Sequence, residues 1–197
     1  MYGDEFYQQK SGIAMGTSCA PVFANIYAAQ VEQDLDVWWG KGILSFVRYI
    51  DNIKLIFEGT REHLQSFIDS RAYGKLKITW EIHSAWEKTP FLDAQFFFSE
   101  KPDVTGVQSK LFRKSMNKHQ YIPWSSAHPE SVKCSFVKAE LTRYIIVSSQ
   151  RSYFEESKEM LFMNQRRRGY PADKLGEFGL QVRYADRSLT LGNTWQR

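Results

Sequence analysis

The chain has 197 residues, of which 43% are hydrophobic and 15% aromatic, so it is too apolar for a disordered chain and long enough for one domain or two small ones. No run reaches the ~18 uninterrupted apolar residues of a membrane helix, and the polar, acidic start does not resemble a signal peptide. Two cysteines, Cys19 and Cys134, are too few for a disulfide framework or a zinc site. We therefore expect an intracellular chain with no membrane partner.

The net charge of +4 is distributed unevenly along the chain. Residues 1–100 carry 9 basic and 13 acidic side chains, whereas residues 101–197 carry 17 basic and 9 acidic ones. Clustered lysine and arginine side chains bind polyanions by releasing counterions, which makes the C-terminal half a candidate nucleic-acid-binding surface. A solvated basic helical face explains the same excess equally well, and the charge alone leaves both interpretations open.

The N-terminal region predicts a shaped loop followed by a helix. Gly, Ser and Gln are frequent in residues 2–20, and apolar residues then recur every three or four positions over 22–35. This period places the apolar side chains on one face of the helix, which we expect to be buried. The residues of that face are Val22, Phe23, Ile26, Tyr27 and Val31.

Two β-prone runs, 46–50 and 53–57, predict a hairpin whose turn is Asp51-Asn52. Because asparagine tolerates a left-handed backbone, turn geometry alone is enough to explain this pair. A helix is expected next over 60–72. Three further strands are predicted before residue 113, over 75–82, 91–98 and 107–112.

The pattern becomes helical after residue 121. Pro129 is expected to begin a first helix, and the capping-box pattern Ser152-Tyr153-Phe154-Glu155 opens a second one that Gly169 closes. A third helix is predicted over 172–187, and residues 188–197 show no periodicity. On the first helix, the residues expected to face the core are Val132, Phe136, Ala139 and Tyr144.

The predicted hairpin places an acidic residue where polymerases hold metal ions. An aspartate at a tight turn between apolar strands projects its carboxylate from a rigid platform, and two-metal phosphoryl transfer needs carboxylates around a pair of Mg²⁺ ions. The residues here are Tyr49-Ile50-Asp51-Asn52. Four residues are a weak match by themselves, so the interpretation depends on what surrounds them.

The surroundings resemble a reverse transcriptase. The loop before the first helix is similar to motif B of that family, and residues 46–57 are similar to its motif C hairpin. The segments that follow are similar, in order, to the primer grip and thumb of Penelope-like retroelement reverse transcriptases, whose helical part is sometimes labelled a helix-turn-helix domain. The residues that carry the resemblance are Gly12-Ile13-Ala14-Met15-Gly16-Thr17-Ser18, Ala20-Pro21, Phe91-Leu92-Asp93, Leu111-Phe112-Arg113-Lys114, Asn117-Lys118-His119-Gln120-Tyr121, Ser126-Ala127-His128-Pro129 and Arg168-Gly169-Tyr170-Pro171.

This resemblance covers residues 6–187 and implies a fold and an activity. The fold class is α+β: a partial right-hand polymerase palm, an antiparallel sheet with helices, over 1–112, then a basic α-helical thumb over 113–187 and a tail over 188–197. The implied activity is that of an RNA-directed DNA polymerase fragment that uses an RNA template, a DNA primer and Mg²⁺. A retroelement polymerase works on nuclear DNA, which implies the nucleus.

The resemblance also implies site residues. Asp51 corresponds to a catalytic metal ligand, and Asn52 occupies the position of a second carboxylate. The nucleotide and the template are expected to contact Gln9, Gly12, Ala14, Met15, Gly16, Pro21 and Tyr49. The phosphates of the RNA–DNA hybrid are expected to contact Lys110, Arg113, Lys114, Lys118, Lys133 and Lys138, although a solvated surface role explains each of these equally well.

The sequence departs from the family pattern at two metal ligands. No residue here corresponds to the motif A aspartate, which an upstream fingers and palm segment would have to supply, and the neutral Asn52 binds Mg²⁺ more weakly than a carboxylate does. We therefore expect the chain alone to bind Mg²⁺ poorly and not to polymerise DNA. The alternative is a non-catalytic remnant that holds template–primer duplex through its basic thumb.

Overall fold

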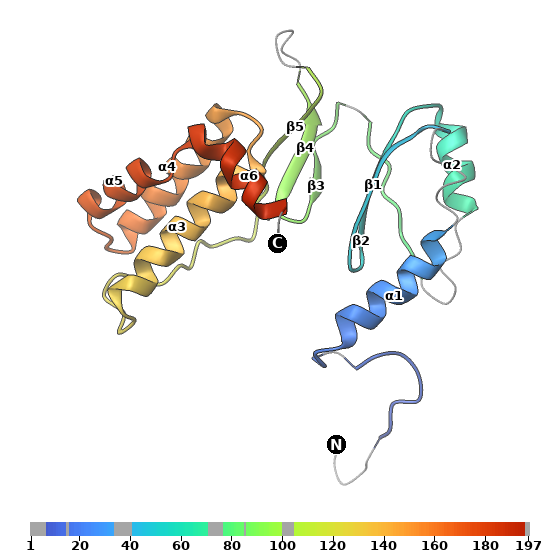
Figure 1. Cartoon of the computed structure of the whole chain (residues 1–197), viewed down its shortest axis with the longest axis horizontal. Coiled ribbons are helices and arrows are strands. Elements are labelled where there is room, and N and C mark those ends of the chain that lie inside the picture. Colours follow the sequence, from blue (N-terminus) through green and yellow to red (C-terminus); the bar gives the residue numbers. More distant parts are fainter. Residues whose placement is uncertain are drawn as a thin grey trace. The chain divides into compact units, whose positions relative to one another are not determined.

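The computed structural model describes residues 7–14, 16–33, 41–70, 77–84, 86–99 and 105–195. They form helices and two small antiparallel sheets, which confirms the predicted α+β class (Figure 1). The chain divides into two compact units, Met1–Ile82 and His83–Arg197. The resemblance predicts a palm over 1–112 and a thumb over 113–187. These limits describe evolutionary descent, which compact units do not test, so they stay a prediction. No helix in the described ranges is both long and apolar enough to cross a membrane.

In the described residues of the first unit, the chain forms one hairpin and two helices. They follow one another as α1 (Ala20–Glu32), β1 (Ile43–Tyr49), β2 (Asn52–Phe57) and α2 (Arg61–Asp69) (Figure 1). The side chain of Thr60 accepts a hydrogen bond from the His63 backbone N–H and so caps α2. The helix predicted over 60–72 is therefore confirmed, and its residue Phe67 is completely buried.

The predicted hairpin is confirmed, but its turn lies one residue earlier than expected. Tyr49 pairs with Asn52, so the turn residues are Ile50 and Asp51. Ile50 has a φ of 55°, a left-handed conformation that a β-branched side chain rarely adopts. Since Asn52 is the first residue of β2, turn geometry does not account for an asparagine at this position.

The apolar face predicted for α1 is not buried. Val22, Phe23 and Ile26 are 56%, 53% and 52% exposed, and the buried residue of this helix is Ala28. Helical spacing places side chains on a common face. Whether that face is covered depends on what packs against it, and the described residues leave it open to solvent.

The strand predicted over 75–82 is wrong for its described part. Residues 77–82 belong to neither sheet, and residues 75 and 76 lie outside the described residues. Ile78 and Trp80 are indeed less exposed than their neighbours, so the alternation that prompted the prediction is real. A strand also needs a hydrogen-bonded neighbour, which alternation of side chains does not supply.

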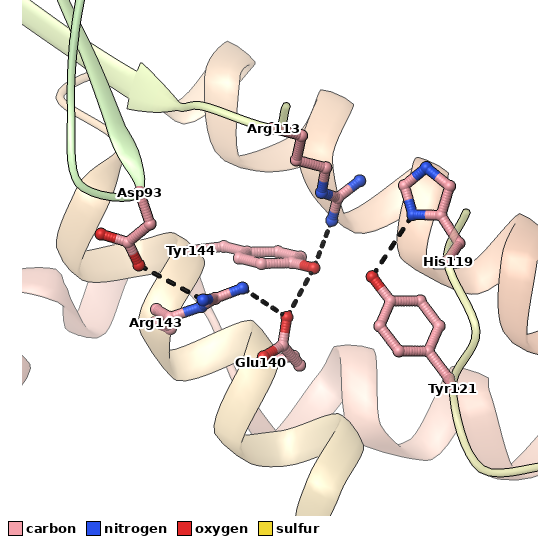
Figure 2. A network of polar contacts seen from close by, with 7 residues as sticks. All are labelled: Asp93, Arg113, His119, Tyr121, Glu140, Arg143 and Tyr144. Atoms are coloured by element: carbon pink, nitrogen blue, oxygen red, sulfur yellow. Dashed lines mark hydrogen bonds and ion pairs between the residues drawn. The ribbon is translucent and has the colours of Figure 1, made fainter. Parts of the chain in front are cut away.

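The second unit begins with a three-stranded antiparallel sheet of β3 (Thr89–Phe91), β4 (Ala94–Phe98) and β5 (Val107–Leu111), in that order. The single strand predicted over 91–98 is therefore split. Its break is a turn at Leu92 and Asp93, where Leu92 has a φ of 55°. The turn places the Asp93 side chain beyond the end of the sheet, toward the helices (Figure 2).

The helices of the second unit follow the sheet. The helices α3 (Glu130–Val147), α4 (Arg151–Arg167) and α5 (Ala172–Gln181) lie side by side, and a 3₁₀ turn, η2 (Tyr184–Asp186), leads to α6 (Arg187–Trp195) (Figure 1). The buried residues of this helical core are Val137, Leu141, Tyr144, Ile145, Phe154, Leu161, Tyr170, Leu175 and Phe178.

Three details of the helical prediction are wrong. Of the face predicted for α3, Tyr144 is buried and Phe136 packs against the core, but Val132 and Ala139 are exposed, because the buried side is rotated toward Val137 and Leu141. Ser152 lies inside α4, whose N-cap is Gln150 without a side-chain cap. The third helix ends at Gln181, and the region predicted to be an aperiodic tail forms α6.

The predicted end of α4 is confirmed. Gly169 has a φ of 84°, and its N–H donates to the Arg166 carbonyl at 3.0 Å. The N–H of Tyr170 donates to the Gln165 carbonyl at 3.1 Å. These two bonds form a Schellman motif, which needs the left-handed backbone that glycine adopts without strain.

Candidate nucleic-acid interface

Asp51 lies exposed at the tip of the hairpin, where the resemblance expects a metal ligand. The Asn52 amide Nδ2 donates to Asp51 Oδ1 at 3.1 Å, so a neutral donor occupies one oxygen of the carboxylate. Within the described ranges, no group of three or more His, Cys, Asp or Glu side chains is arranged to hold a metal ion. The hairpin tip thus presents one carboxylate beside one amide.

Arg48 fixes the hairpin tip to α1. Its Nε donates to Glu32 Oε1 at 2.6 Å, and its Nη1 donates to Asn25 Oδ1 at 2.7 Å and to the Ile50 carbonyl at 3.2 Å. The ion pair is largely buried, because the side chains of Arg48 and Glu32 are 12% and 14% exposed. Sequence analysis did not single out Arg48; the available signal was an arginine inside an otherwise apolar strand.

The loop that resembles motif B lies against this tip. Ile50 shares a hollow of about 430 Å³ with loop residues and with the first turns of α1. The predicted residues Gly16 and Pro21 are thus brought together with the hairpin. The hollow is lined by Ile13, Gly16, Thr17, Ala20, Pro21, Ala24 and Ile50.

The other predicted nucleotide-site residues do not line this hollow. Gln9 is exposed and donates from Nε2 to the Ser11 carbonyl at 2.9 Å. Gly12 and Ala14 are exposed loop residues, and Tyr49 is 57% exposed on β1. Met15 lies outside the described residues.

The second unit carries a stretch of one charge sign. Residues 104–129 contain four Lys or Arg side chains and two histidines but no Asp or Glu. From residue 112 this stretch runs along α3, against which Tyr121 packs with its ring 5.3 Å from that of Phe136. We call the following residues the basic strip: Lys110, Arg113, Lys114, Lys118 and His119.

A chain of polar contacts holds Arg113 in place (Figure 2). Arg113 Nη2 donates to the Tyr144 hydroxyl, which donates to Glu140 Oε2 at 2.9 Å. The same carboxylate oxygen accepts from Arg143 Nη2 at 2.8 Å, and Arg143 Nη1 lies 3.3 Å from Asp93 Oδ2. The β3–β4 turn, the segment after β5 and α3 are therefore joined by one network.

Tyr144 is the centre of this network. Burial raises the pKa of its phenol, so the hydroxyl remains protonated and both donates to Glu140 and accepts from Arg113. The Arg113 guanidinium also lies over the Tyr144 ring, 5.2 Å from its centroid. Two different contacts with the same ring therefore fix the direction in which Arg113 points.

Two lysines predicted to contact phosphates are engaged inside the unit. Lys133 is 7% exposed, and its Nζ donates to the carbonyls of Trp124 and Ser126 at 2.5 and 2.8 Å. Lys138 Nζ lies 5.5 Å from the ring centroid of Phe178. Lys133 thus ties the loop before α3 to that helix, and a phosphate contact by either lysine stays a prediction.

The turn between α3 and α4 has three residues, 148–150, and is held from two sides. The Ser149 N–H donates to the Ser109 carbonyl on β5 at 2.9 Å. From the other side, the Tyr184 hydroxyl donates to the Ser148 carbonyl at 3.2 Å, and Arg187 Nε donates to the Ile145 carbonyl at 3.1 Å. Sequence analysis missed Tyr184 and Arg187, because the pattern there predicted the end of a helix and a tail.

Acidic side chains outnumber basic ones in the first half of α4. Glu156 and Glu159 are exposed, whereas Glu155 is partly buried and pairs with Lys158 and, at 3.6 Å, with Arg151. Arginines gather at the other end of the helix, where Arg166 and Arg167 are exposed in the last turn. The first half of α4 therefore carries more negative than positive charge, although Arg151 is exposed at its start, and a phosphate backbone is attracted less by such a surface.

Comparison with known proteins finds one family model that is similar to the region around this turn. Residues 120–175 match the family model of the animal helix-turn-helix domain, a range that contains α3, α4 and the first residues of α5. The match covers less than a third of the chain and does not identify a reverse transcriptase. No curated protein and no solved structure matches the chain.

Proposed function

We propose that the chain is the C-terminal palm and thumb part of a Penelope-like reverse transcriptase and that it holds RNA–DNA hybrid through its basic strip. The helix-turn-helix match supports the proposal, because it covers the region that resembles the thumb. The observation that carries it is the basic strip, which no acidic residue interrupts. Lys114 and Lys118 of this strip are exposed, and Arg113 is held by Tyr144. Such a polymerase fragment would act in the nucleus.

The strip is a better candidate contact than the start of α4. In many helix-turn-helix proteins, the N-terminal residues of the second helix read bases in the major groove. Here the helix begins with the exposed Arg151, but Glu156 and Glu159 follow within its next two turns, and its preceding turn is covered by β5 and by Tyr184. Carboxylates are repelled by phosphates, so the duplex is expected to lie along the strip.

The chain alone is not expected to polymerise DNA. Asp51 is the remaining motif C carboxylate, and Asn52 donates to it instead of adding a second negative charge. We infer that Mg²⁺ binds weakly at the tip and that the chain acts as a duplex-holding remnant unless an upstream palm segment completes the site.

Salt-dependent binding tests the proposal. The logarithm of the affinity for a fluorescent RNA–DNA hybrid should fall linearly with the logarithm of salt concentration. Replacing both exposed lysines, Lys114→Gln with Lys118→Gln, should reduce that slope by roughly two, one for each lost phosphate contact. The matched control pairs Glu156→Gln with Glu159→Gln on α4.

The two variants distinguish the basic strip from α4 as the surface that contacts the duplex. An unchanged slope in the lysine variant would remove the basic strip as the contact, and a clear gain of affinity in the glutamate variant would place the duplex near α4. Absence of binding by the full chain at low salt would overturn the proposed function altogether.

A further inference from the structure

We propose that Arg113 and His119 form a binding site for one phosphate group and that Tyr144 is the positioning residue for Arg113. The site deepens the proposed function, on which it rests, by naming where a phosphate of the nucleic-acid backbone is held. Figure 2 shows the free end of the Arg113 guanidinium beside the His119 ring, with Tyr144 on the opposite side of the guanidinium.

Arg113 retains unused hydrogen-bond donors. One nitrogen, Nη2, is bonded to Tyr144, whereas Nε and Nη1 have no protein partner in the described part of the chain. Arg143 is different, because it is bonded to the carboxylates of Glu140 and Asp93. Arg113 contacts a neutral hydroxyl and no described carboxylate, so its charge and its fork of donors remain available to an anion.

His119 is held in an unusual backbone conformation. Its φ is 49°, and the turn is closed by two hydrogen bonds: the His119 N–H donates to Asn117 Oδ1 at 2.8 Å and the Tyr121 N–H donates to the His119 carbonyl at 2.9 Å. Its ring Nδ1 lies 3.5 Å from the Tyr121 hydroxyl, and Nε2 has no described partner. Strained residues of this kind gather at ligand sites, because the surrounding structure must hold them there.

Arg113 disfavours the protonated form of His119 when no anion is present. Partial burial and the neighbouring Arg113 charge lower the pKa of His119. The groups that face His119 are Arg113 from the segment after β5 and Tyr121 from its own loop, while Tyr144 and Glu140 on α3 lie behind Arg113. A phosphate between the two would attract both, so its binding should be accompanied by protonation of His119.

Titration of the full chain by NMR tests the site, with inorganic phosphate as the probe. Phosphate should raise the pKa of His119 while leaving that of His128, an exposed histidine of the same unit, unchanged. Arg113→Gln should weaken phosphate binding about tenfold, as expected for the loss of a charged hydrogen-bond partner. Arg113→Lys should restore only part of it, since lysine keeps the charge and loses the fork.

Tyr144→Phe tests the positioning role. It removes the hydroxyl that holds Nη2 and should reduce the phosphate-induced change at His119, even though Arg113 and His119 are both present. Because Tyr144 is completely buried, the urea midpoint of the variant is measured alongside. A conservative Arg113→Lys variant with full stability and reduced phosphate affinity separates the site from a loss of folding.

The outcomes separate this site from the proposed function. Equal responses of His119 and His128 to phosphate would overturn the site, even if RNA–DNA hybrid binds with the expected salt slope. A selective response of His119 without any hybrid binding would support the site and overturn the proposed function.

Discussion

Ser109 and Ser149 join β5 to the turn of the helix-turn-helix through reciprocal hydrogen bonds. The Ser149 N–H donates to the Ser109 carbonyl at 2.9 Å, and the Ser109 N–H donates to Ser149 Oγ at 3.0 Å. The hydroxyl of Ser149 lies 2.8 Å from Oε1 of the buried Gln108, which accepts its proton. The turn is therefore paired with a strand that lies outside the matched range 120–175.

Ser149→Ala should destabilise the second unit. The substitution leaves the Ser109 N–H without its partner in a partly buried region and leaves Gln108 Oε1 with the Gln150 amide alone, which costs about 1–2 kcal/mol. Urea unfolding of the full chain gives the change in free energy. Ser152→Ala, at an exposed position of α4, is the matched control and should change the stability by less than about 0.5 kcal/mol. Equal effects would show that the Ser149 bonds contribute nothing specific.

The helical core shows what local patterns determine. The end of α4 was predictable, because a glycine after an arginine-rich turn meets the geometric requirement of a Schellman motif by itself. The buried side of α3 was not, since apolar spacing of 3.6 residues leaves the choice between Phe136 and Val137 to the neighbouring helices. α6 was missed because Arg187 and Tyr184 act through bonds to distant carbonyls, which leave no periodic pattern.

Ile50→Asn should stabilise the first unit. Asparagine adopts the left-handed backbone found at residue 50 more readily than a β-branched residue does, and relief of that strain is worth about 1 kcal/mol. The bond from Arg48 to the Ile50 carbonyl involves the backbone and is retained. Far-UV circular dichroism in urea measures the change.

Val47→Asn provides the comparison for this substitution. Val47 is a similarly exposed residue of β1, where asparagine is disfavoured, so this variant should be less stable. If Ile50→Asn lowers stability as much as Val47→Asn does, apolar contacts of Ile50 in the hollow outweigh its backbone strain.

Lys54 should make the stability of the first unit depend on alkaline pH. Burial lowers its pKa from 10.5 to about 8, so between these values the unfolded chain binds more protons than the folded one. Stability should therefore rise with pH across this window. Lys54→Met should remove the rise and add about 1 kcal/mol at neutral pH, a figure reduced for the solvent that still reaches the ammonium. Lys77→Met, at an exposed position, is the control.

Primer extension by the purified chain should not be detectable. The described tip offers one carboxylate and an amide, whereas two-ion catalysis needs several carboxylate oxygens. Assays with RNA template, DNA primer and Mg²⁺ measure this directly, with Asp51→Ala as the matched variant. Robust synthesis that disappears in Asp51→Ala would contradict the proposal and would require a metal site formed with residues beyond those described.

The candidate interface was predictable in part. Charge counting located the basic half, and the resemblance pointed to the loop and the hairpin, where Ile50 lines one hollow with Gly16 and Pro21. The sequence does not indicate which basic side chains remain available to phosphate, because Lys133 and Arg113 both lie in similar basic surroundings. In the structure, the loop before α3 buries Lys133 and accepts its hydrogen bonds, and this burial depends on contacts across the whole unit.

The hydrogen bonds of Arg48 restrict how the hairpin tip can move. Since one side chain holds Asn25, Glu32 and the Ile50 carbonyl together, the hairpin tip cannot move away from α1 without breaking a largely buried ion pair. Segments linked in this way open cooperatively. Hydrogen exchange should therefore protect the amides of β1 and α1 to a similar degree, and Arg48→Met should separate the two segments into independent exchange groups.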